Sequence, residues 1–424
     1  MTDVPQRQPV AAHHLLNFID GRWAPAASGR TRTNRNPADL RDRIGEFTES
    51  DGADAERAVA AAATALPGWR ALGPIRRAAH LTALGRQLAD REEEFTAAIT
   101  REQGKLRAEA RAEVARARAV LEFTAGQARL LGGVTAPAEE DRTFAYTFRR
   151  PLGVVGLVSP WNFPLAIPVW KVAPALLSGC TAVLKPSPLT PLTAALLTDA
   201  AQRAGVPDGV LNLVQGDAAA GAALVAHPQV AGISFTGSLA VGTAIHTAGA
   251  PRLLRTQLEL GGKNAVIVLA DADLDRAVDA VLHGAFGQAG QRCSATSRAV
   301  VDRRVRDAFL ARLVKRVAAL RVGPGDDPDS EVCPVVDPVL CGGGPAARPG
   351  LPEGCYVQPT VIRDVPWDSE LAQEEVFGPV LAVVDADGFD DAMRIANCRE
   401  RGPTGPAPPP PARTTASSRR PPRR

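Results

Sequence analysis

The sequence has few lysines and aromatic residues and no long hydrophobic run, and these shortages exclude several classes of protein. No apolar stretch reaches the roughly 18 residues that a membrane-spanning helix needs. Residues 1–8 lack the basic and apolar regions of a secretion signal. The six cysteines form no C-x-x-C pair, so neither zinc-site nor disulfide-framework spacing is visible. We therefore expect a cytoplasmic protein with no metal site and no membrane partner, in which any special cysteine is a nucleophile.

The 424 residues exceed what one compact core usually holds, so the length predicts at least two packed units. The formal net charge of +3 is unevenly placed. Residues 401–424 hold six of the 49 basic residues and none of the 46 acidic ones, which leaves a net charge of −3 on the rest. A nucleic-acid-binding tail is an alternative function, but its arginines have no interleaved aromatic residues. We therefore expect no nucleic-acid partner.

Arginine replaces lysine almost everywhere, since only five of the 49 basic residues are lysines. A lysine that persists in such a chain marks a position that favours a compact ammonium group over a planar guanidinium. The lysines are Lys105, Lys171, Lys185, Lys263 and Lys315.

The order of helical and apolar segments predicts an α/β fold. Residues 51–66 predict a helix that Pro67 and Gly68 end. Two strands around a polar turn are predicted at 143–148 and 152–158, as a projecting hairpin. Short apolar runs then alternate with helical segments, which is typical of a parallel sheet covered on both faces. Ligands of such sheets bind at the carboxyl ends of the strands.

Three polar residues stand in short motifs suited to chemistry, and each has a structural alternative. Cys293 lies in glycine-rich, polar surroundings where a thiolate is accessible; otherwise it is an ordinary half-buried cysteine. Glu259 stands between two leucines at a strand end, where desolvation raises the pKa of a general base; otherwise it is a surface residue. Asn162 offers an amide donor for an oxyanion; otherwise its loop is a structural turn.

Taken together, these motifs resemble the aldehyde dehydrogenase family over residues 18–397. Six motifs in the family's order carry the resemblance: PWNFP (160–164), KPS (185–187), FTGS (235–238) with Gly242, ELGGK (259–263), GQRC (290–293) and EEVFGP (374–379). The resemblance implies an aldehyde dehydrogenase-like α/β fold: a parallel-sheet dinucleotide-binding domain (1–140 and 151–258), a bridging and oligomerisation β-hairpin (141–150) and an incomplete catalytic domain (259–397). The Pro/Arg-rich composition beyond it predicts a disordered tail (398–424).

The resemblance also implies a reaction. The Cys293 thiolate adds to an aldehyde carbonyl, and the oxyanion is held by the Asn162 amide and the Cys293 backbone N–H. After hydride transfer to the nicotinamide, water activated by Glu259 hydrolyses the thioester to the carboxylic acid. Relatives that transfer the acyl group to coenzyme A lack this carboxylate, so we expect hydrolytic oxidation.

The implied cofactor-binding residues are Trp161, Lys185, Ser187, Gly237, Ser238, Glu375 and Phe377. Lys185 resembles the lysine that binds the adenosine ribose, and the helix starting at Ser238 offers free N–H groups to a pyrophosphate. Many NAD-dependent relatives have a glutamate after the KPS motif that repels a 2′-phosphate, and this chain has Pro188. We therefore expect NAD or NADP as cofactor.

The sequences around these motifs are most similar to those of bacterial enzymes that act on 2-oxoglutarate semialdehyde or on aromatic aldehydes. Arg292 either attracts a substrate carboxylate or has a structural role. Two departures from the family stand out: a helix is missing near residue 340, and the resemblance stops at Asn397, which we interpret as a truncation or frameshift. The family is homodimeric or homotetrameric, but its oligomerisation strand is missing here, so we expect aggregation. A non-catalytic relic that binds dinucleotide is the alternative function.

Overall fold

The computed structural model describes residues 11–337, 344–346 and 350–398. Its strands are β1 (Asn17–Ile19), β2 (Arg22–Ala24), β3 (Thr31–Asn36), β4 (Asp39–Thr48), β5 (Thr135–Ala136), β6 (Ala145–Tyr146), β7 (Val154–Val158), β8 (Thr181–Lys185), β9 (Leu211–Leu213), β10 (Val230–Gly237), β11 (Arg255–Leu260), β12 (Ala265–Val268), β13 (Arg298–Asp302), β14 (Thr360–Ile362) and β15 (Val380–Ala386). Its α-helices are α1 (Gly52–Ala71), α2 (Gly73–Asp90), α3 (Glu92–Gln103), α4 (Arg107–Gly126), α5 (Ala166–Ser178), α6 (Pro191–Arg203), α7 (Ala218–Ala226), α8 (Leu239–Gly249), α9 (Leu274–Phe286), α10 (Arg306–Ala318), α11 (Glu370–Gln373) and α12 (Gly388–Asn397). Short 3-10 helices are η1 (Ala12–Leu15), η2 (Gln127–Arg129), η3 (Ala250–Arg252) and η4 (Gly287–Gly290).

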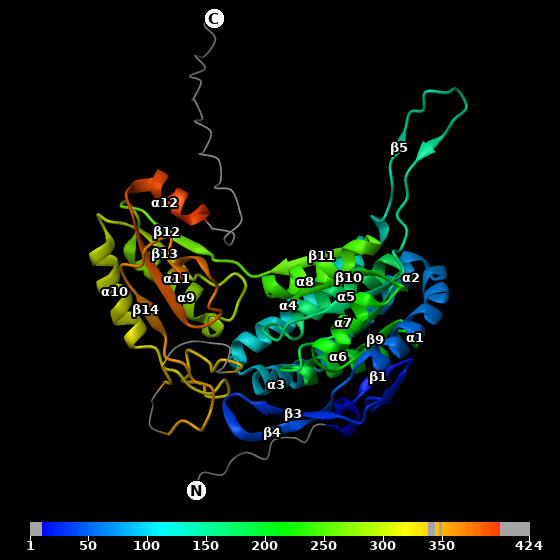
Figure 1. The fold of residues 1–424 in the computed structure, drawn as a ribbon, viewed down its shortest axis with the longest axis horizontal. Coiled ribbons are helices and arrows are strands. Elements are labelled where there is room, and N and C mark those ends of the chain that lie inside the picture. Colours follow the sequence, from blue (N-terminus) through cyan, green and yellow to red (C-terminus); the bar gives the residue numbers. More distant parts are fainter. Residues whose placement is uncertain (1–10, 338–343, 347–349, 399–424) are drawn as a thin grey trace, which may run out of the picture.

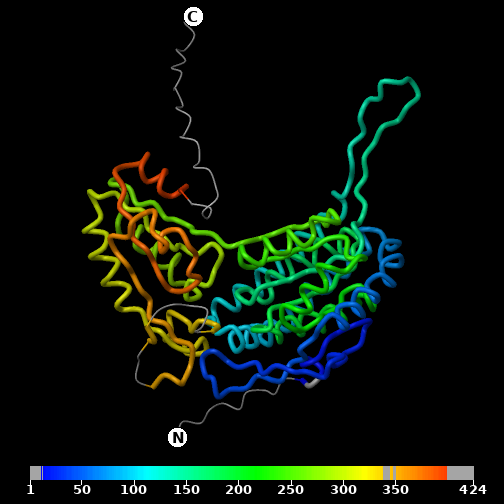
Figure 2. Tube along the Cα trace, viewed as in Figure 1, coloured from blue at the N-terminus to red at the C-terminus, as the bar shows by residue number. Residues whose placement is uncertain are grey.

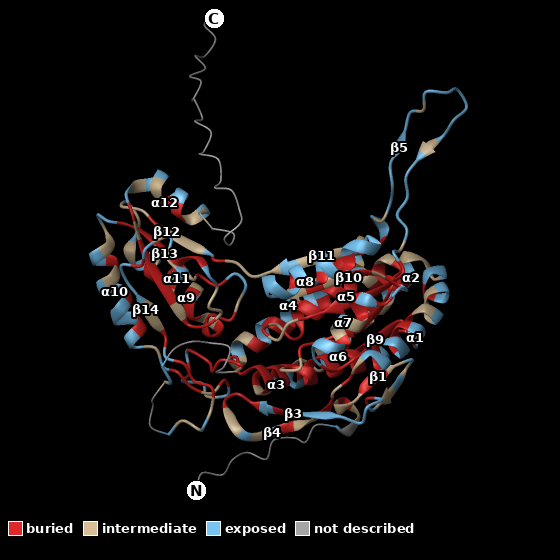
Figure 3. Cartoon of the chain, in the orientation of Figure 1, coloured by how far each residue is buried: buried red, intermediate tan, exposed pale blue. Residues whose placement is uncertain are grey.

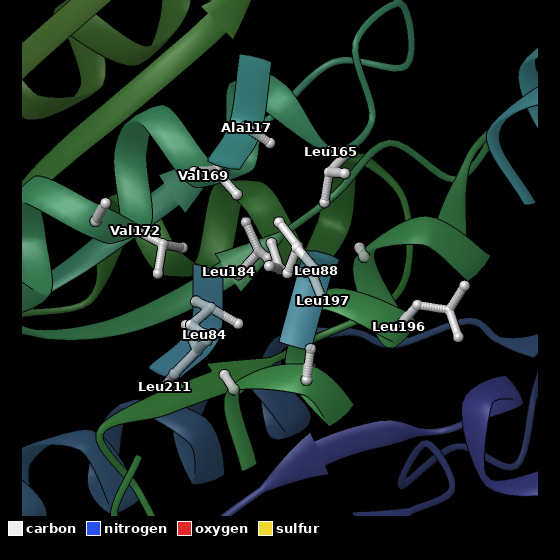
Figure 4. Packing of buried hydrophobic residues seen from close by; sticks show 14 of the residues in the cluster. Leu84, Leu88, Ala117, Leu165, Val169, Val172, Leu184, Leu196, Leu197 and Leu211 are labelled. Atoms are coloured by element: carbon white, nitrogen blue, oxygen red, sulfur yellow. The ribbon is translucent and has the colours of Figure 1, made fainter. Parts of the chain in front are cut away.

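A seven-stranded sheet in the order β11-β10-β7-β8-β9-β1-β2 is the centre of the larger half of the molecule (Figure 1). Strands β7 to β11 pair in parallel, and β1 joins the edge at β9 antiparallel. Alternate residues of one strand enter different cores: Leu157 packs with α2, α4, α5 and α6, whereas Val154 and Val158 pack with α1 and α7. The predicted parallel sheet with both faces covered is therefore confirmed, and Figure 4 shows leucines of one core interlocking.

A four-stranded parallel sheet in the order β12-β13-β15-β14 follows in the chain. The C-terminal part of the chain that holds it, coloured yellow to red, lies at one end of the molecule in Figure 2. Its two faces are again covered. Val301 and Val383 pack against α9 and α10, and Val300 and Val384 pack in the core that holds Ile395 of α12. Burial is concentrated along both sheets (Figure 3). No helix in the described ranges is long and apolar enough to cross a membrane.

The projecting hairpin exists, and one of its strands, β6, lies inside the predicted run 143–148, but the prediction of the other strand was wrong. It is formed by β5 and β6, which pair Thr135 with Tyr146 and Ala136 with Ala145, and it extends away from the body (Figure 1). The run that was expected to form its second strand is β7, whose five residues are all buried inside the large sheet. The physical reason is the burial of apolar surface: β7 is continuously apolar, and leaving it in water would forfeit the free energy that its burial between two layers of helices provides.

The predicted end of the first helix was also wrong. Asp51 caps α1 as expected, accepting a hydrogen bond from the Ala53 N–H, but the helix continues through Pro67 to Ala71. Trp69 explains the continuation, because it is 1% exposed and its Nε1 donates to the Leu176 carbonyl oxygen at 3.0 Å. The region near residue 340, where a helix of the family was predicted to be missing, lies largely outside the described residues. The tail from 399 onward also lies outside them.

Candidate active site

Cys293 lies just beyond α9 and η4, on a tightly bent segment. It is exposed, whereas Cys180, Cys333 and Cys355 are buried and Cys398 is half-buried. The bend comes from three successive residues of positive φ at 288–290. A side chain at the last of these, a glycine, would place its Cβ 2.2 Å from the Gly378 carbonyl oxygen. The sequence thus folds the cysteine segment onto the segment that carries Glu375 and Phe377, with the thiol left accessible.

Asn162 is tied to the same segment. Its side-chain amide is buried and donates to the Gln291 carbonyl oxygen at 3.1 Å, two residues before Cys293. Its own carbonyl oxygen accepts hydrogen bonds from Lys105 Nζ at 2.9 Å and from Gln288 Nε2 at 2.5 Å. The structure therefore brings the predicted oxyanion donor and the predicted nucleophile together, although they are far apart in sequence.

A buried ion pair that the sequence reasoning missed supports the Asn162 loop. Lys105 and Glu113 have fully buried side chains, and Nζ lies 2.5 Å from Oε2. The other carboxylate oxygen of Glu113 accepts from the backbone N–H groups of Leu165 and Ala166 at 2.9 and 3.0 Å, where α5 begins. The ammonium also lies 4.4 Å from the ring centroid of Phe163. The scarcity of lysine was the only signal for this position.

Asn264 was also missed by the sequence reasoning. Its Nδ2 donates to the backbone carbonyl oxygen of Cys293 at 2.6 Å and to that of Ala295 at 3.3 Å. Asn264 directly follows the ELGGK motif, so its position next to a motif was the available signal. Asn162 thus holds the backbone before Cys293, at Gln291, and Asn264 holds it at Cys293 and just after, at Ala295.

Glu259 is the penultimate residue of β11 and lies beside Thr236 of β10. The expected desolvation is wrong, because the side chain is exposed. A hydrogen-bond chain reaches it instead: Gln257 Nε2 donates to Glu259 Oε1 at 2.7 Å, the Ser234 hydroxyl donates to Gln257, and Lys171 Nζ donates to Ser234 Oγ at 2.8 Å. Burial lowers the pKa of Lys171 to about 8, and the charge of Glu259 acts in the opposite direction. A polar path therefore connects a buried ammonium to the carboxylate.

Trp161, Glu375 and Phe377 converge as expected. The rings of Trp161 and Phe377 meet edge to face with centroids 5.4 Å apart. Glu375 Oε1 accepts from the Gly262 N–H at 3.4 Å, and a side chain at Gly261 would collide with the same carboxylate. A pocket lies where three segments meet. Its lining includes Gly262, Arg292, Glu375 and Phe377.

The other predicted cofactor residues lie at the carboxyl ends of β8 and β10, which flank β7. Lys185 is 6% exposed, and burial lowers its pKa to about 8. Ser187 accepts a hydrogen bond from the Leu189 N–H at 3.3 Å within a turn. Ser238 caps α8 by accepting from the Val241 N–H at 3.4 Å, and Gly237 precedes it. The predicted helix start at Ser238 is therefore confirmed.

The guanidinium of Arg292 makes hydrogen bonds within the fold. Its Nη2 donates to the carbonyl oxygens of His283 and Gly284 at 2.7 and 2.9 Å, in the last turn of α9. A guanidinium that satisfies helix-terminal carbonyls stabilises the end of that helix. The structural alternative for Arg292 is the one that these contacts favour.

Comparison with known proteins agrees with this architecture. The model of the aldehyde dehydrogenase family matches residues 23–339 and 338–405. The alpha-ketoglutaric semialdehyde dehydrogenase of Bacillus subtilis is 39% identical over 402 residues, which cover 90% of this chain and 82% of the relative. The betaine aldehyde dehydrogenase of Staphylococcus aureus, solved with NAD+, superposes with a TM-score of 0.88 at 33% identity, over 91% of this chain and 82% of that one. An NADP-dependent enzyme of E. coli gives 0.87 at 34% identity, over 91% and 83%.

The fold and the converging site define an NAD(P)-dependent oxidoreductase of α/β architecture. The chain belongs to the aldehyde dehydrogenase family. Its cofactor is NAD or NADP, and its activity is the oxidation of an aldehyde. The alternative of a non-catalytic relic is not favoured, because the match covers most of the length of active relatives. The family match extends beyond Asn397 to residue 405.

Proposed function

We propose that Cys293 is the nucleophile, Glu259 the general base and Asn162 the oxyanion donor of this aldehyde oxidation. The observation that supports the proposal is the hydrogen bond from the Asn162 amide to the Gln291 carbonyl oxygen, two residues before the exposed Cys293. The Cys293 thiolate adds to the aldehyde carbon, forming a C–S bond and an oxyanion. The second amide hydrogen of Asn162 is available to stabilise that oxyanion.

When bound, the nicotinamide accepts the hydride that leaves the thiohemiacetal carbon. The residues that would hold the cofactor are those at the ends of β8 and β10 together with Trp161, Glu375 and Phe377. Two features of the chain fit a dinucleotide: the buried ammonium of Lys185, and the N-terminus of α8 directly after a parallel strand. In this proposal the seven-stranded sheet is the cofactor-binding domain, and the segment from Glu259 onward is the catalytic domain.

Hydrolysis of the thioester needs a base that accepts a proton from water. The exposed carboxylate of Glu259 meets this need, because water reaches it directly. The hydrogen-bond chain through Gln257 and Ser234 to Lys171 orients its Oε1. The products are the carboxylic acid and the free thiol, so one oxidation consumes one water.

For the substrate we propose the semialdehyde of a dicarboxylic acid. The support is the 39% identity with a relative named for alpha-ketoglutaric semialdehyde. Nη2 of Arg292 is bound to two helix carbonyls, so this nitrogen is not available to a substrate carboxylate. An aromatic aldehyde is the competing candidate.

The test is NADH or NADPH production with aliphatic, semialdehyde and aromatic substrates, for the protein and its Cys293→Ala variant. Cys398→Ala is the matched control, since this half-buried cysteine lies at the end of α12. We expect turnover to vanish in the first variant and to persist in the second. Undiminished turnover in Cys293→Ala would falsify the mechanism, and a preference for aromatic substrates would overturn the substrate proposal.

We also propose that the hairpin mediates contact with a second copy of the chain. Phe144, Tyr146 and Phe148 are 73%, 59% and 56% exposed, and their rings stack along one side at 5.5 and 5.9 Å. Exposed aromatic rows of this kind are typical of protein interfaces. Sedimentation of a Phe144→Ser/Phe148→Ser variant should show a smaller assembly than the parent. An unchanged sedimentation coefficient would contradict this role.

A further inference from the structure

The turn that leads to Cys293 has a strained backbone. Gln288 and Ala289 have φ angles of 53° and 51°, in the left-handed region that residues other than glycine rarely occupy, and Gly290 continues the turn at 71°. Gln288 and Ala289 are both buried. A backbone of this kind persists only where the surrounding structure holds it in place. The contacts of the turn therefore decide where the segment of Cys293 lies.

Glu109 holds this turn at its first residue. Its Oε1 accepts a hydrogen bond from the backbone N–H of Gln288 at 2.7 Å. Its Oε2 accepts from the Leu106 N–H at 3.2 Å, because Glu109 stands at the N3 position of α4. Hydrogen bonds to an ionised acceptor are stronger than those between neutral groups. One carboxylate thus closes the beginning of a helix and fixes the first strained residue of a distant turn.

Three charged side chains at the beginning of α4 contact the site together. Glu113 lies one helical turn after Glu109 on the same face, and Lys105, which is paired with Glu113, stands just ahead of the helix. Lys105 Nζ and Gln288 Nε2 both donate to the Asn162 carbonyl oxygen. The same helix end therefore holds the loop of Asn162 and the strained turn in one arrangement.

We propose that Glu109 is a positioning residue of the aldehyde oxidation: by holding Gln288 in the left-handed turn, it sets the place of the Cys293 sulfur relative to the Asn162 amide. The Gln291 N–H donates to the Gln288 carbonyl oxygen at 3.0 Å, and the Gln291 carbonyl accepts from Asn162, so a shift of the turn displaces this contact too. A misplacement of about 1 Å can cost about a hundredfold in rate. This inference rests on the proposed roles of Cys293 and Asn162 and deepens them.

Hydrogen–deuterium exchange of the full chain, followed in the peptide 286–293, tests the contact itself. We expect Glu109→Ala to raise the exchange rate of the Gln288 amide at least about tenfold, because the amide loses its acceptor. Glu109→Gln keeps a side-chain carbonyl oxygen as acceptor and should stay within about threefold of the parent. Glu122→Ala, an exposed change on the same helix, is the control. Unchanged exchange in Glu109→Ala would overturn the proposal.

The kinetics of cofactor reduction separate positioning from damage to the helix. In Glu109→Ala we expect kcat to fall about tenfold and the KM of the cofactor to stay within about twofold, because the ends of β8 and β10 are untouched. Adding Ala289→Gly should bring kcat back to within about threefold of the parent, since glycine adopts positive φ without steric cost.

This rescue is the decisive outcome, because a glycine outside α4 cannot repair a lost helix cap. Failure of Ala289→Gly to restore kcat would therefore overturn the proposal. Turnover that persists in Cys293→Ala would refute the proposed function instead, and the exchange of the peptide 286–293 would then still support or contradict the role of Glu109.

Discussion

The ammonium of Lys105 donates a 2.9 Å hydrogen bond to the backbone carbonyl oxygen of Asn162. From the other side, the Asn162 amide donates to the Gln291 carbonyl oxygen at 3.1 Å. The loop that carries Asn162, the proposed oxyanion donor, is therefore held between a buried ion pair and the segment of Cys293, the proposed nucleophile. A donor fixed before the substrate enters does not need to reorient as charge develops, which is the property that makes oxyanion stabilisation effective.

Replacing Lys105 by Met should destabilise the whole protein. The substitution leaves the Glu113 carboxylate buried without its cation, and breaking a buried pair in this way costs about 3–5 kcal/mol of the free energy of unfolding. Urea denaturation measures the loss. The matched change Lys315→Met, on the exposed side of α10, should stay within about 0.5 kcal/mol of the parent. Equal losses in the two variants would show that the pair stabilises nothing.

Glu259→Gln should separate thioester formation from hydrolysis. An amide cannot take a proton from water, so we expect a burst of reduced cofactor stoichiometric with the protein, followed by turnover at least about a hundredfold slower than the parent. Stopped-flow absorbance records both phases. Glu122→Gln, an exposed change on α4, is the control. Steady turnover in Glu259→Gln at the parental rate would assign the base to another residue.

The cysteines should differ sharply in reactivity toward iodoacetamide at about pH 8, because only an accessible thiolate is alkylated. Cys293 is exposed and should react first. Burial raises the pKa of Cys355 to about 11 and that of Cys333 well above its ordinary value, so neither should react in the native protein. Peptide mass spectrometry after brief labelling assigns the modified positions. Faster labelling of Cys333 than of Cys293 would mean that the two environments are reversed.

The sequence singled out candidate residues more readily than the scaffold around them. Cys293, Glu259 and Asn162 could be proposed because each stands in a motif of unusual composition. Lys105 and Asn264 were missed as partners of the site, because a hydrogen bond between segments far apart in sequence leaves no local pattern. The second strand of the hairpin was misassigned for a related reason. The apolar run at 152–158 predicts a strand, but it does not indicate which sheet that strand joins. The end of α1 was predicted wrongly at Pro67, because the burial of Trp69 outweighs the loss of one helical hydrogen bond.

The buried ammonium of Lys185 should make stability depend on alkaline pH. Burial lowers its pKa from 10.5 to about 8, so above about pH 8 the folded chain has released a proton that the unfolded chain still binds. Unfolding then takes up a proton, and the free energy of unfolding rises with pH until the unfolded lysine titrates as well. Lys185→Met removes this contribution. Between about pH 8 and 10, urea denaturation should therefore show the parent gaining about 2 kcal/mol relative to the variant. A constant difference between the two proteins across that range would mean that the ammonium keeps its proton when buried, which requires a partner for its charge.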